Sequence, residues 1–260
     1  VALDRTVMGN RDVWLMDLAR DGFTRFTFDA ALDGYPVWSP DGTRIVFESK
    51  RKGGSWDLWI KPSSGAGTEE LLLETPNDEW PYDWSKDGRF LLYHVTDPKT
   101  GPDLWALPMT GADWTPVVVA NTPFTENNGQ FSPDGRLVAY ETNESGRFEI
   151  VVQTFPERVG KWQPSTAGGR QARWRADGKE LYFVAPDSKM MAVTVAAAGT
   201  TLEAGKAVAL FSFNNLYLGG VDKAQYAVAR DGRFLINQPR EGTAAPPITL
   251  IQHWNPEAKK

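Results

Sequence analysis

The chain has 260 residues, no cysteine and a formal net charge of −5 at pH 7. Without cysteine, disulfides and thiolate metal sites are excluded, and an acidic chain without a basic run lacks the clustered positive surface that nucleic-acid binding requires. No apolar run approaches the roughly 18 residues of a membrane-spanning helix, so we expect neither a nucleic-acid partner nor a membrane span.

The first predicted elements are three β-rich segments at residues 1–6, 12–18 and 24–28. They match the second, third and fourth strands of a repeat that becomes complete further along the chain. The chain therefore opens inside a repeat whose first strand and turn are missing. Because it starts at Val1 without a signal-peptide pattern, we expect a mature product or a fragment.

A strand–turn–strand pattern begins at Tyr35 and is centred on Asp41 and Gly42. Pro40 presets φ for the turn, Asp41 can hydrogen-bond its own backbone, and Gly42 supplies a positive φ. The pattern recurs, with glycines spaced by 46, 47, 43 and 54 residues. The later turn glycines are Gly88, Gly135, Gly178 and Gly232.

Each repeat also contains further β-rich segments, such as residues 57–60 and 70–73, separated by turns rich in Gly, Ser and Pro. Four short strands in a period of about 45 residues are typical of a β-propeller blade. The sequence therefore predicts an all-β fold, a β-propeller of six four-stranded blades with an incomplete first blade. A five-bladed ring, in which the terminal segments merge into one blade, is the alternative.

We predict a single propeller domain over residues 1–260. The predicted blades are a partial first blade at 1–30, four blades at 31–75, 76–121, 122–167 and 168–212, and a last blade at 213–256.

Aromatic residues precede the turns, and aspartates lie within them. We expect the rings to fill the space between neighbouring blades, and the aspartates to serve the turns and not a ligand. The rings are Trp38, Trp84, Phe131 and Trp174, and the aspartates are Asp41, Asp87, Asp134, Asp177 and Asp231.

The motif at residues 38–42, Trp-Ser-Pro-Asp-Gly, and its repetition resemble the TolB-like six-bladed β-propellers of the WD-like class, over residues 12–254. The chain is similar in particular to propeller regions attached to bacterial kinases and transcription regulators, on phrases such as residues 160–163. The resemblance implies a protein- or ligand-binding module in a periplasmic or other extracytoplasmic location. The chain departs from the motif at residues 175–176 and 229–230, where Ser-Pro is replaced.

The sequence contains no nucleophile elbow, zinc-protease helix motif or P-loop. Its two histidines, His94 and His253, fall in predicted strands far apart in the sequence. We interpret both as packing residues, and we predict no catalytic residue.

Three carboxylates are in phase with the repeat. Asp33, Glu79 and Glu126 each lie nine residues before a turn glycine. We place them in the loops before the innermost strands, which converge on one mouth of a propeller channel. Carboxylates from successive blades could take a cation, an amine or a basic peptide, since hard cations prefer oxygen ligands; the alternative is that acidic residues simply favour solvated loops.

Aromatic and amide side chains accompany the carboxylates in the predicted channel mouth, where they either form a recognition surface or pack the blades. They are Tyr35, Trp80, Tyr82, Asn127 and Asn128, with Tyr217 before the last blade.

The favoured hypothesis is a non-catalytic binding, sensor or scaffold propeller that recognises a protein, a peptide or a small ligand at this mouth. A compatible hypothesis is that the chain is a fragment of a larger signalling protein. The alternative is a metal-dependent enzyme of the lactonase or esterase type that uses the channel carboxylates. We expect no cofactor for the first hypothesis and a divalent cation such as Ca²⁺, held by Asp33, Glu79 and Glu126, for the second.

Overall fold

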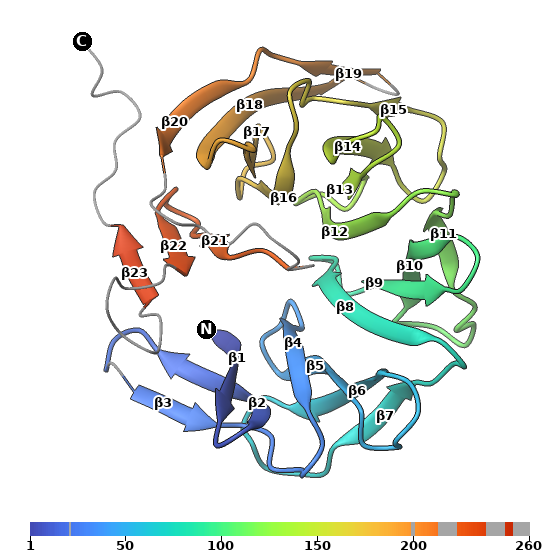
Figure 1. The fold of residues 1–260 in the computed structure, drawn as a ribbon, viewed down its shortest axis with the longest axis vertical. Helices are drawn as coiled ribbons and strands as arrows, with labels where there is room; N and C mark the ends of the chain where they lie inside the picture. Colours follow the sequence, from blue (N-terminus) through green and yellow to red (C-terminus); the bar gives the residue numbers. More distant parts are fainter. Residues whose placement is uncertain (21, 199–200, 213–222, 238–247, 252–260) are drawn as a thin grey trace. The chain divides into compact units, whose positions relative to one another are not determined.

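The computed structural model describes residues 1–20, 22–198, 201–212, 223–237 and 248–251. These residues form antiparallel β-strands arranged in six separate sheets (Figure 1). None of the described segments is a helix of the length and apolarity needed to cross a membrane. The all-β prediction is confirmed. The chain divides into two compact units, Val1–Phe124 and Thr125–Lys260.

The first unit contains a three-stranded sheet followed by two four-stranded sheets, each with its strands in sequence order. The first sheet lacks the strand that opens the later ones, as the sequence predicts. The strands are β1 (Ala2–Val7), β2 (Asn10–Asp17), β3 (Gly22–Arg25), β4 (Asp33–Trp38), β5 (Arg44–Ser49), β6 (Asp57–Pro62), β7 (Glu70–Leu73), β8 (Asp78–Trp84), β9 (Phe90–Asp97), β10 (Gly101–Pro108) and β11 (Val117–Ala120).

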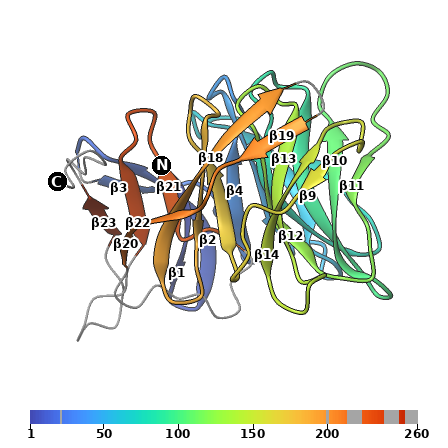
Figure 2. The same ribbon diagram turned by 90° about the horizontal axis from the view of Figure 1, so that it is seen from above.

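The second unit contains a four-stranded, a five-stranded and a three-stranded sheet. In Figure 2, β12, β13 and β14 run beside one another, with their connections at the two ends of the sheet. The strands are β12 (Glu126–Phe131), β13 (Leu137–Thr142), β14 (Glu149–Thr154), β15 (Lys161–Trp162), β16 (Arg170–Trp174), β17 (Glu180–Val184), β18 (Lys189–Ala198), β19 (Thr201–Ala204), β20 (Val208–Ser212), β21 (Tyr226–Val228), β22 (Phe234–Asn237) and β23 (Ile248–Ile251).

The turn between the first two strands of a sheet is built as its residues predict. In the turn after β4, Asp41 accepts hydrogen bonds from the hydroxyl of Ser39 (2.5 Å) and the backbone N–H of Thr43 (3.0 Å). Gly42 has a φ of +72°, where a side chain would be strained. Asp87 and Asp134 make the same two bonds in their turns, and Asp177 and Asp231 make the backbone bond. The structural role predicted for these aspartates is confirmed.

The rings before the turns pack between neighbouring sheets in two clear cases. Trp84, at the end of β8, contacts Val37 and Val46 of the preceding sheet. Trp174, at the end of β16, contacts Leu137 and Ile150 of the sheet before it. Phe131 is buried as well. The prediction fails for Trp38, which is 38% exposed and lies outside the apolar cluster between the first sheet and β5.

The innermost strand of four sheets contains a β-bulge, at matching positions. The pairing register shifts between Gly34 and Val37, and likewise in β8, β12 and β16. A bulge bends the strand and re-aims its side chains. Three of the bulges hold a residue with positive φ other than glycine: Tyr35 (+52°), Asn128 (+50°) and Gln171 (+60°).

Candidate functional site

The predicted mouth residues lie at the start of the innermost strands, next to the bulges. Asp33 and Glu126 are the first residues of β4 and β12, and Glu79 is the second residue of β8. The expectation that they lie in the loops before these strands is wrong, because the strands extend upstream to include them. All three side chains are at most 1% exposed. The alternative of solvated acidic loops fails for the same reason.

Asp33 is neutralised within its own sheet. Arg51 Nη2 lies 3.0 and 2.9 Å from its two carboxylate oxygens. Arg51 also pairs with Glu69 and stacks 4.5 Å from the ring centroid of Trp59. Burial raises the pKa of Asp33, against the hydrogen bond from Ser49 and the charge of Arg51, which lower it. Asp33 is therefore a structural ion-pair partner.

Glu79 is buried with one hydrogen bond. The Thr75 hydroxyl donates to Oε1, and Oε2 has no hydrogen-bond partner. Burial raises the pKa of Glu79 to about 7, and the nearby carboxylate of Asp57 adds to the rise. A carboxyl group in this position exchanges its proton near neutral pH.

Two aromatic side chains, Trp80 and Tyr82, pack against His94 beside Glu79. The ring of Trp80 lies 4.4 Å from the imidazole, and the hydroxyl of Tyr82 is hydrogen-bonded to Nδ1 of His94. His94 is 2% exposed, and burial lowers its pKa to about 3, so the imidazole is neutral at pH 7. The packing role predicted for His94 agrees with this geometry. Trp80 and Tyr82 are half-buried, as is Tyr35 on the neighbouring β4.

In the second unit, Glu126, Asn127 and Asn128 are all about 1% exposed. Asn128 donates from Nδ2 to the carboxylate of Glu141 (2.9 Å), which also accepts from Arg170 (2.9 Å) and from the backbone of Gln171. Burial raises the pKa of Glu141, and the charge of Arg170 opposes the rise. Asn128 therefore supports the Glu141 carboxylate, which joins two neighbouring sheets.

The polar residues of the second strands are not among the site residues predicted from the sequence. Glu48, His94 and Glu141 each lie six residues after a turn glycine, in strands that are otherwise apolar and buried. Glu48 pairs with Arg11 of the first sheet, as Glu141 pairs with Arg170. A polar residue recurring at one position of an apolar strand is the signal that could have found them.

Two residues singled out in the sequence have no described position. Tyr217 and His253 lie outside the described residues. Among the residues that are described, no group of three or more His, Asp or Glu side chains is arranged to hold a metal ion. The metal role of Asp33, Glu79 and Glu126 stays a prediction.

The comparisons with known proteins agree with the fold. No family model matches the sequence. The Tol-Pal system protein TolB of Anaeromyxobacter dehalogenans (strain 2CP-C) is 29% identical over 113 residues, which are 43% of this chain and 24% of TolB. The match thus spans about a quarter of that relative's length.

Solved structures match over nearly the whole chain. The crystal structure of TolB from Acinetobacter baumannii gives a TM-score of 0.72 at 14% identity and covers 96% of this chain and 59% of that one. An oligogalacturonate lyase in complex with manganese gives 0.61 at 14% identity and covers 96% and 74%. At such identities the likeness shows the fold alone. The chain has the β-propeller fold and is similar to TolB.

Proposed function

We propose that the chain is a non-catalytic binding propeller that recognises a protein or peptide partner at the starts of its innermost strands. The observation that carries the proposal is a difference in burial between the carboxylates and the aromatic rings of the first unit. The carboxylates Asp33 and Glu79 are buried, whereas the rings of Tyr35, Trp80 and Tyr82 are partly exposed. Partly exposed aromatic side chains next to a rigid strand supply contact area at low entropic cost and are enriched at recognition surfaces.

The bulges support this assignment. Tyr35 and Asn128 hold a positive φ that costs non-glycine residues about 1–3 kcal/mol. Such strain persists where the surroundings fix it, and it occurs more often at binding sites than elsewhere. In β8 the corresponding residue is Pro81, whose ring forbids a positive φ, and the register shift follows it directly.

We also propose the finer features implied by the resemblance. Each of the six sheets counts as one blade. The chain is the propeller region of a longer protein such as a kinase or regulator. Its location is periplasmic or otherwise extracytoplasmic. Support comes from the six sheets and from the likeness to a protein of the Tol-Pal system.

A peptide selection tests the proposed site. A random peptide library displayed on phage is selected on the wild-type protein, and the affinity of the enriched peptides is measured for Trp80→Ala and for Trp114→Ala. Trp114 is 48% exposed and lies outside the site, so it is the matched control. We expect at least about a tenfold loss for Trp80→Ala, as for an aromatic hot spot, and none for Trp114→Ala. Equal affinities for all three proteins would refute the site.

A thermal-shift series separates the metal-dependent enzyme from the binding module. The protein is heated with Ca²⁺, Mg²⁺, Mn²⁺, Zn²⁺ or EDTA, as wild type and as Glu79→Gln/Glu126→Gln. A ligand that binds only the folded state raises the melting temperature. The binding module predicts equal melting temperatures in all conditions, whereas stabilisation by one metal that the double variant loses would favour the lactonase-type alternative.

A further inference from the structure

A hydrogen-bonded pair of side chains, Tyr82 and His94, lies at the bulge of β8. Tyr82 is the extra residue of this bulge, because the pairing register passes from Pro81 directly to Asp83. A bulge re-aims the side chain of its extra residue, and the Tyr82 hydroxyl is hydrogen-bonded to Nδ1 of His94. Tyr82 is half-buried and His94 is buried. The pair therefore connects a partly exposed side chain of the proposed recognition site to a nitrogen in the interior.

The repeat does not require this pair. His94 lies six residues after a turn glycine, and Tyr82 lies six residues before it. Where the counterparts are described, those of His94 are Glu48, Glu141 and Val184, and those of Tyr82 are Pro36, Gly129, Ala172 and Tyr226. Tyr226 is buried and donates its hydroxyl to the carbonyl oxygen of Gln171. The other described sheets thus form without such a pair, and the fold alone does not account for it.

The proton of the Tyr82 hydroxyl is committed to the bond with His94. Burial lowers the pKa of His94 to about 3, so its imidazole is neutral and carries a single N–H. A phenol O–H is the more acidic donor of the two groups, and an imidazole nitrogen is the more basic acceptor. Tyr82 therefore donates to Nδ1, and the imidazole N–H is at Nε2, which lies 3.5 Å from the Thr96 hydroxyl. Toward a partner, the Tyr82 oxygen then acts as a hydrogen-bond acceptor.

The strands around the pair carry acidic but no basic side chains. Every other sheet with an acidic strand residue also has a Lys or Arg in its described strands, whereas β8, β9, β10 and β11 have none. Asp78 lies on the same face as Trp80 and Thr96, because Asp78 and Thr96 are directly opposite and side chains two residues apart share a face. Its carboxylate accepts from the backbone N–H of Trp56 (2.9 Å) and makes no ion pair with any described residue. The charge on this face favours a cation.

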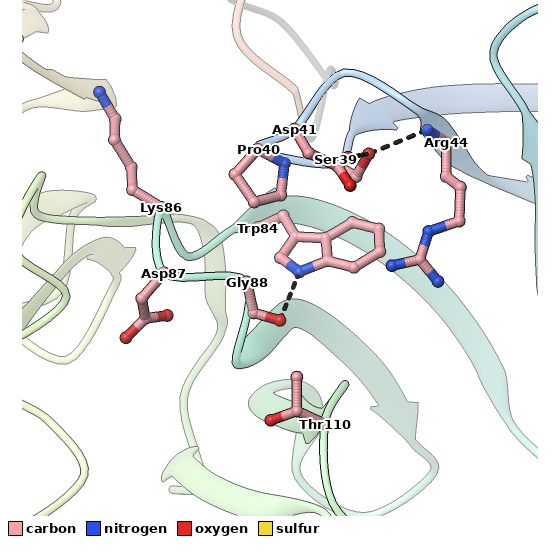
Figure 3. A pocket seen from close by; sticks show the side chains of 9 residues that line it. All are labelled: Ser39, Pro40, Asp41, Arg44, Trp84, Lys86, Asp87, Gly88 and Thr110. Atoms are coloured by element: carbon pink, nitrogen blue, oxygen red, sulfur yellow. Dashed lines mark hydrogen bonds between the residues drawn. The ribbon is translucent and has the colours of Figure 1, made fainter.

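Other tryptophan rings of the first unit are contacted by a cation of the chain, and Trp80 is not. At the far end of β8, beside a cavity of about 390 Å³, the guanidinium of Arg44 lies 5.1 Å from the ring centroid of Trp84 (Figure 3). The further rings with such a contact are those of Trp14, Trp56 and Trp59. Among the described residues, no arginine or lysine lies over Trp80, whose ring packs against the neutral His94. This half-buried ring is thus in a sheet that supplies no cation of its own.

We propose that the recognition site takes a basic side chain, an arginine or a lysine, of a protein or peptide partner, and that His94 positions Tyr82 to receive it. This inference rests on the proposed function and names the chemistry of its partner. The rings of Trp80 and Tyr82 lie 4.4 and 5.2 Å from the same imidazole, so they adjoin and offer one aromatic surface to the cation. The N–H groups of the cation donate to the Tyr82 oxygen, and Asp78 supplies the opposite charge. His94 holds the hydroxyl proton and does not touch the partner.

Nitrogen NMR of the histidine rings tests the proton assignment on the free protein. His94 is one of two histidines, so the variant His253→Gln identifies its signals. We expect a neutral ring at pH 7 that is protonated on Nε2. Protonation on Nδ1 would make Tyr82 the acceptor of the bond and a donor toward the partner, which would overturn the proposal.

Calorimetric titration at about 0.15 M salt, which screens unspecific charge attraction, tests the partner chemistry. The probes are tetraarginine and tetralysine peptides blocked at both ends, with tetraglutamine as the neutral control. We expect at least one basic probe to bind the wild type, about tenfold or more weakly in Tyr82→Phe and with unchanged affinity in Tyr182→Phe. Tyr182→Phe is the matched control, because it removes a hydroxyl that donates to Glu180 outside the site. Absence of binding by both basic probes, equal binding of tetraglutamine, or full affinity in Tyr82→Phe would overturn the proposal.

A double-variant cycle tests how His94 acts. His94→Phe keeps a ring against Trp80 but removes Nδ1. We expect it to weaken binding of the basic probe in the wild-type background and to cause no further loss in the Tyr82→Phe background. Equal losses in both backgrounds would show that His94 acts by packing and not through the Tyr82 hydroxyl.

The peptides from the phage selection separate this inference from the proposed function. Enriched peptides that need Trp80 but contain neither Arg nor Lys would overturn the inference and leave the recognition site standing. Peptides whose affinity does not depend on Trp80 would refute the site itself.

Discussion

Arg51 binds Asp33 through one guanidinium nitrogen that lies 2.9 and 3.0 Å from the two carboxylate oxygens. The carboxylate is fully buried, and the arginine side chain is 11% exposed. The pair explains how an acidic residue is tolerated at the start of an inner strand. It also removes Asp33 from the groups that are free to meet a ligand.

Arg51→Ala is expected to destabilise the protein by about 3–5 kcal/mol, because it leaves a buried carboxylate without its counter-charge. Lys52→Ala is the control. Lys52 pairs with Glu74 on the surface, where both side chains are nearly half-exposed, and its loss should cost about 1 kcal/mol or less. Urea unfolding measures both. Equal losses would show that the Arg51 pair contributes no more than a surface pair.

Trp84→Ala is expected to lower the free energy of unfolding by about 3–5 kcal/mol, because the ring is 4% exposed and packs against the preceding sheet. Trp38→Ala, at the same place in the repeat, should cost about 1 kcal/mol or less, since that ring is 38% exposed. Chemical denaturation of the two variants checks the difference, and a larger loss for Trp38→Ala would contradict the burial pattern.

The raised pKa of Glu79 predicts that the stability of the folded protein depends on pH. Its pKa is about 7 in the folded protein, above the ordinary value of 4.5, so the folded state holds the proton more tightly. The stability from this group is fully present below pH 4.5 and is lost as the pH rises to about 7. In Glu79→Gln, the melting temperature should fall less between these pH values than in the wild type. Glu70→Gln, which removes an exposed carboxylate, should follow the wild type; an unchanged profile for Glu79→Gln would be evidence against the shift.

Gly168→Ala should destabilise the second unit for two reasons. Its φ is +94°, and an added Cβ would lie 2.5 Å from Cγ of the rigid Pro186 ring. Gly146→Ala separates the two effects, because its φ is +87° but nothing lies within 4 Å of the added atom. We expect about 1–2 kcal/mol for Gly146→Ala and a clearly larger loss for Gly168→Ala, measured by thermal unfolding. Similar losses would mean that Pro186 moves aside easily.

The sequence predicts the turns and the strands beside them well, because interactions between residues close together in the chain determine these elements. The Asp-Gly turns form through hydrogen bonds between residues two apart, such as Asp41 and Thr43, so their composition is sufficient to predict them. The strands on both sides follow from β-branched and aromatic content. Placing Asp33 and Glu79 was harder, because the extent of a strand depends on pairing with a neighbour and not on its own residues.

By itself, the sequence determined the repeat, the all-β class and the turn chemistry, since each depends on residues close together in the chain. Only the tertiary structure decided which side chains are available for binding. Asp33 is neutralised by Arg51, and the Asn128 amide is occupied by Glu141, each across a sheet. Arg44 lies 5.1 Å from the ring centroid of Trp84 in the next sheet, a contact between residues 40 positions apart that the repeat does not specify. Burial and charge pairing arise from contacts between distant residues, which composition and spacing do not specify.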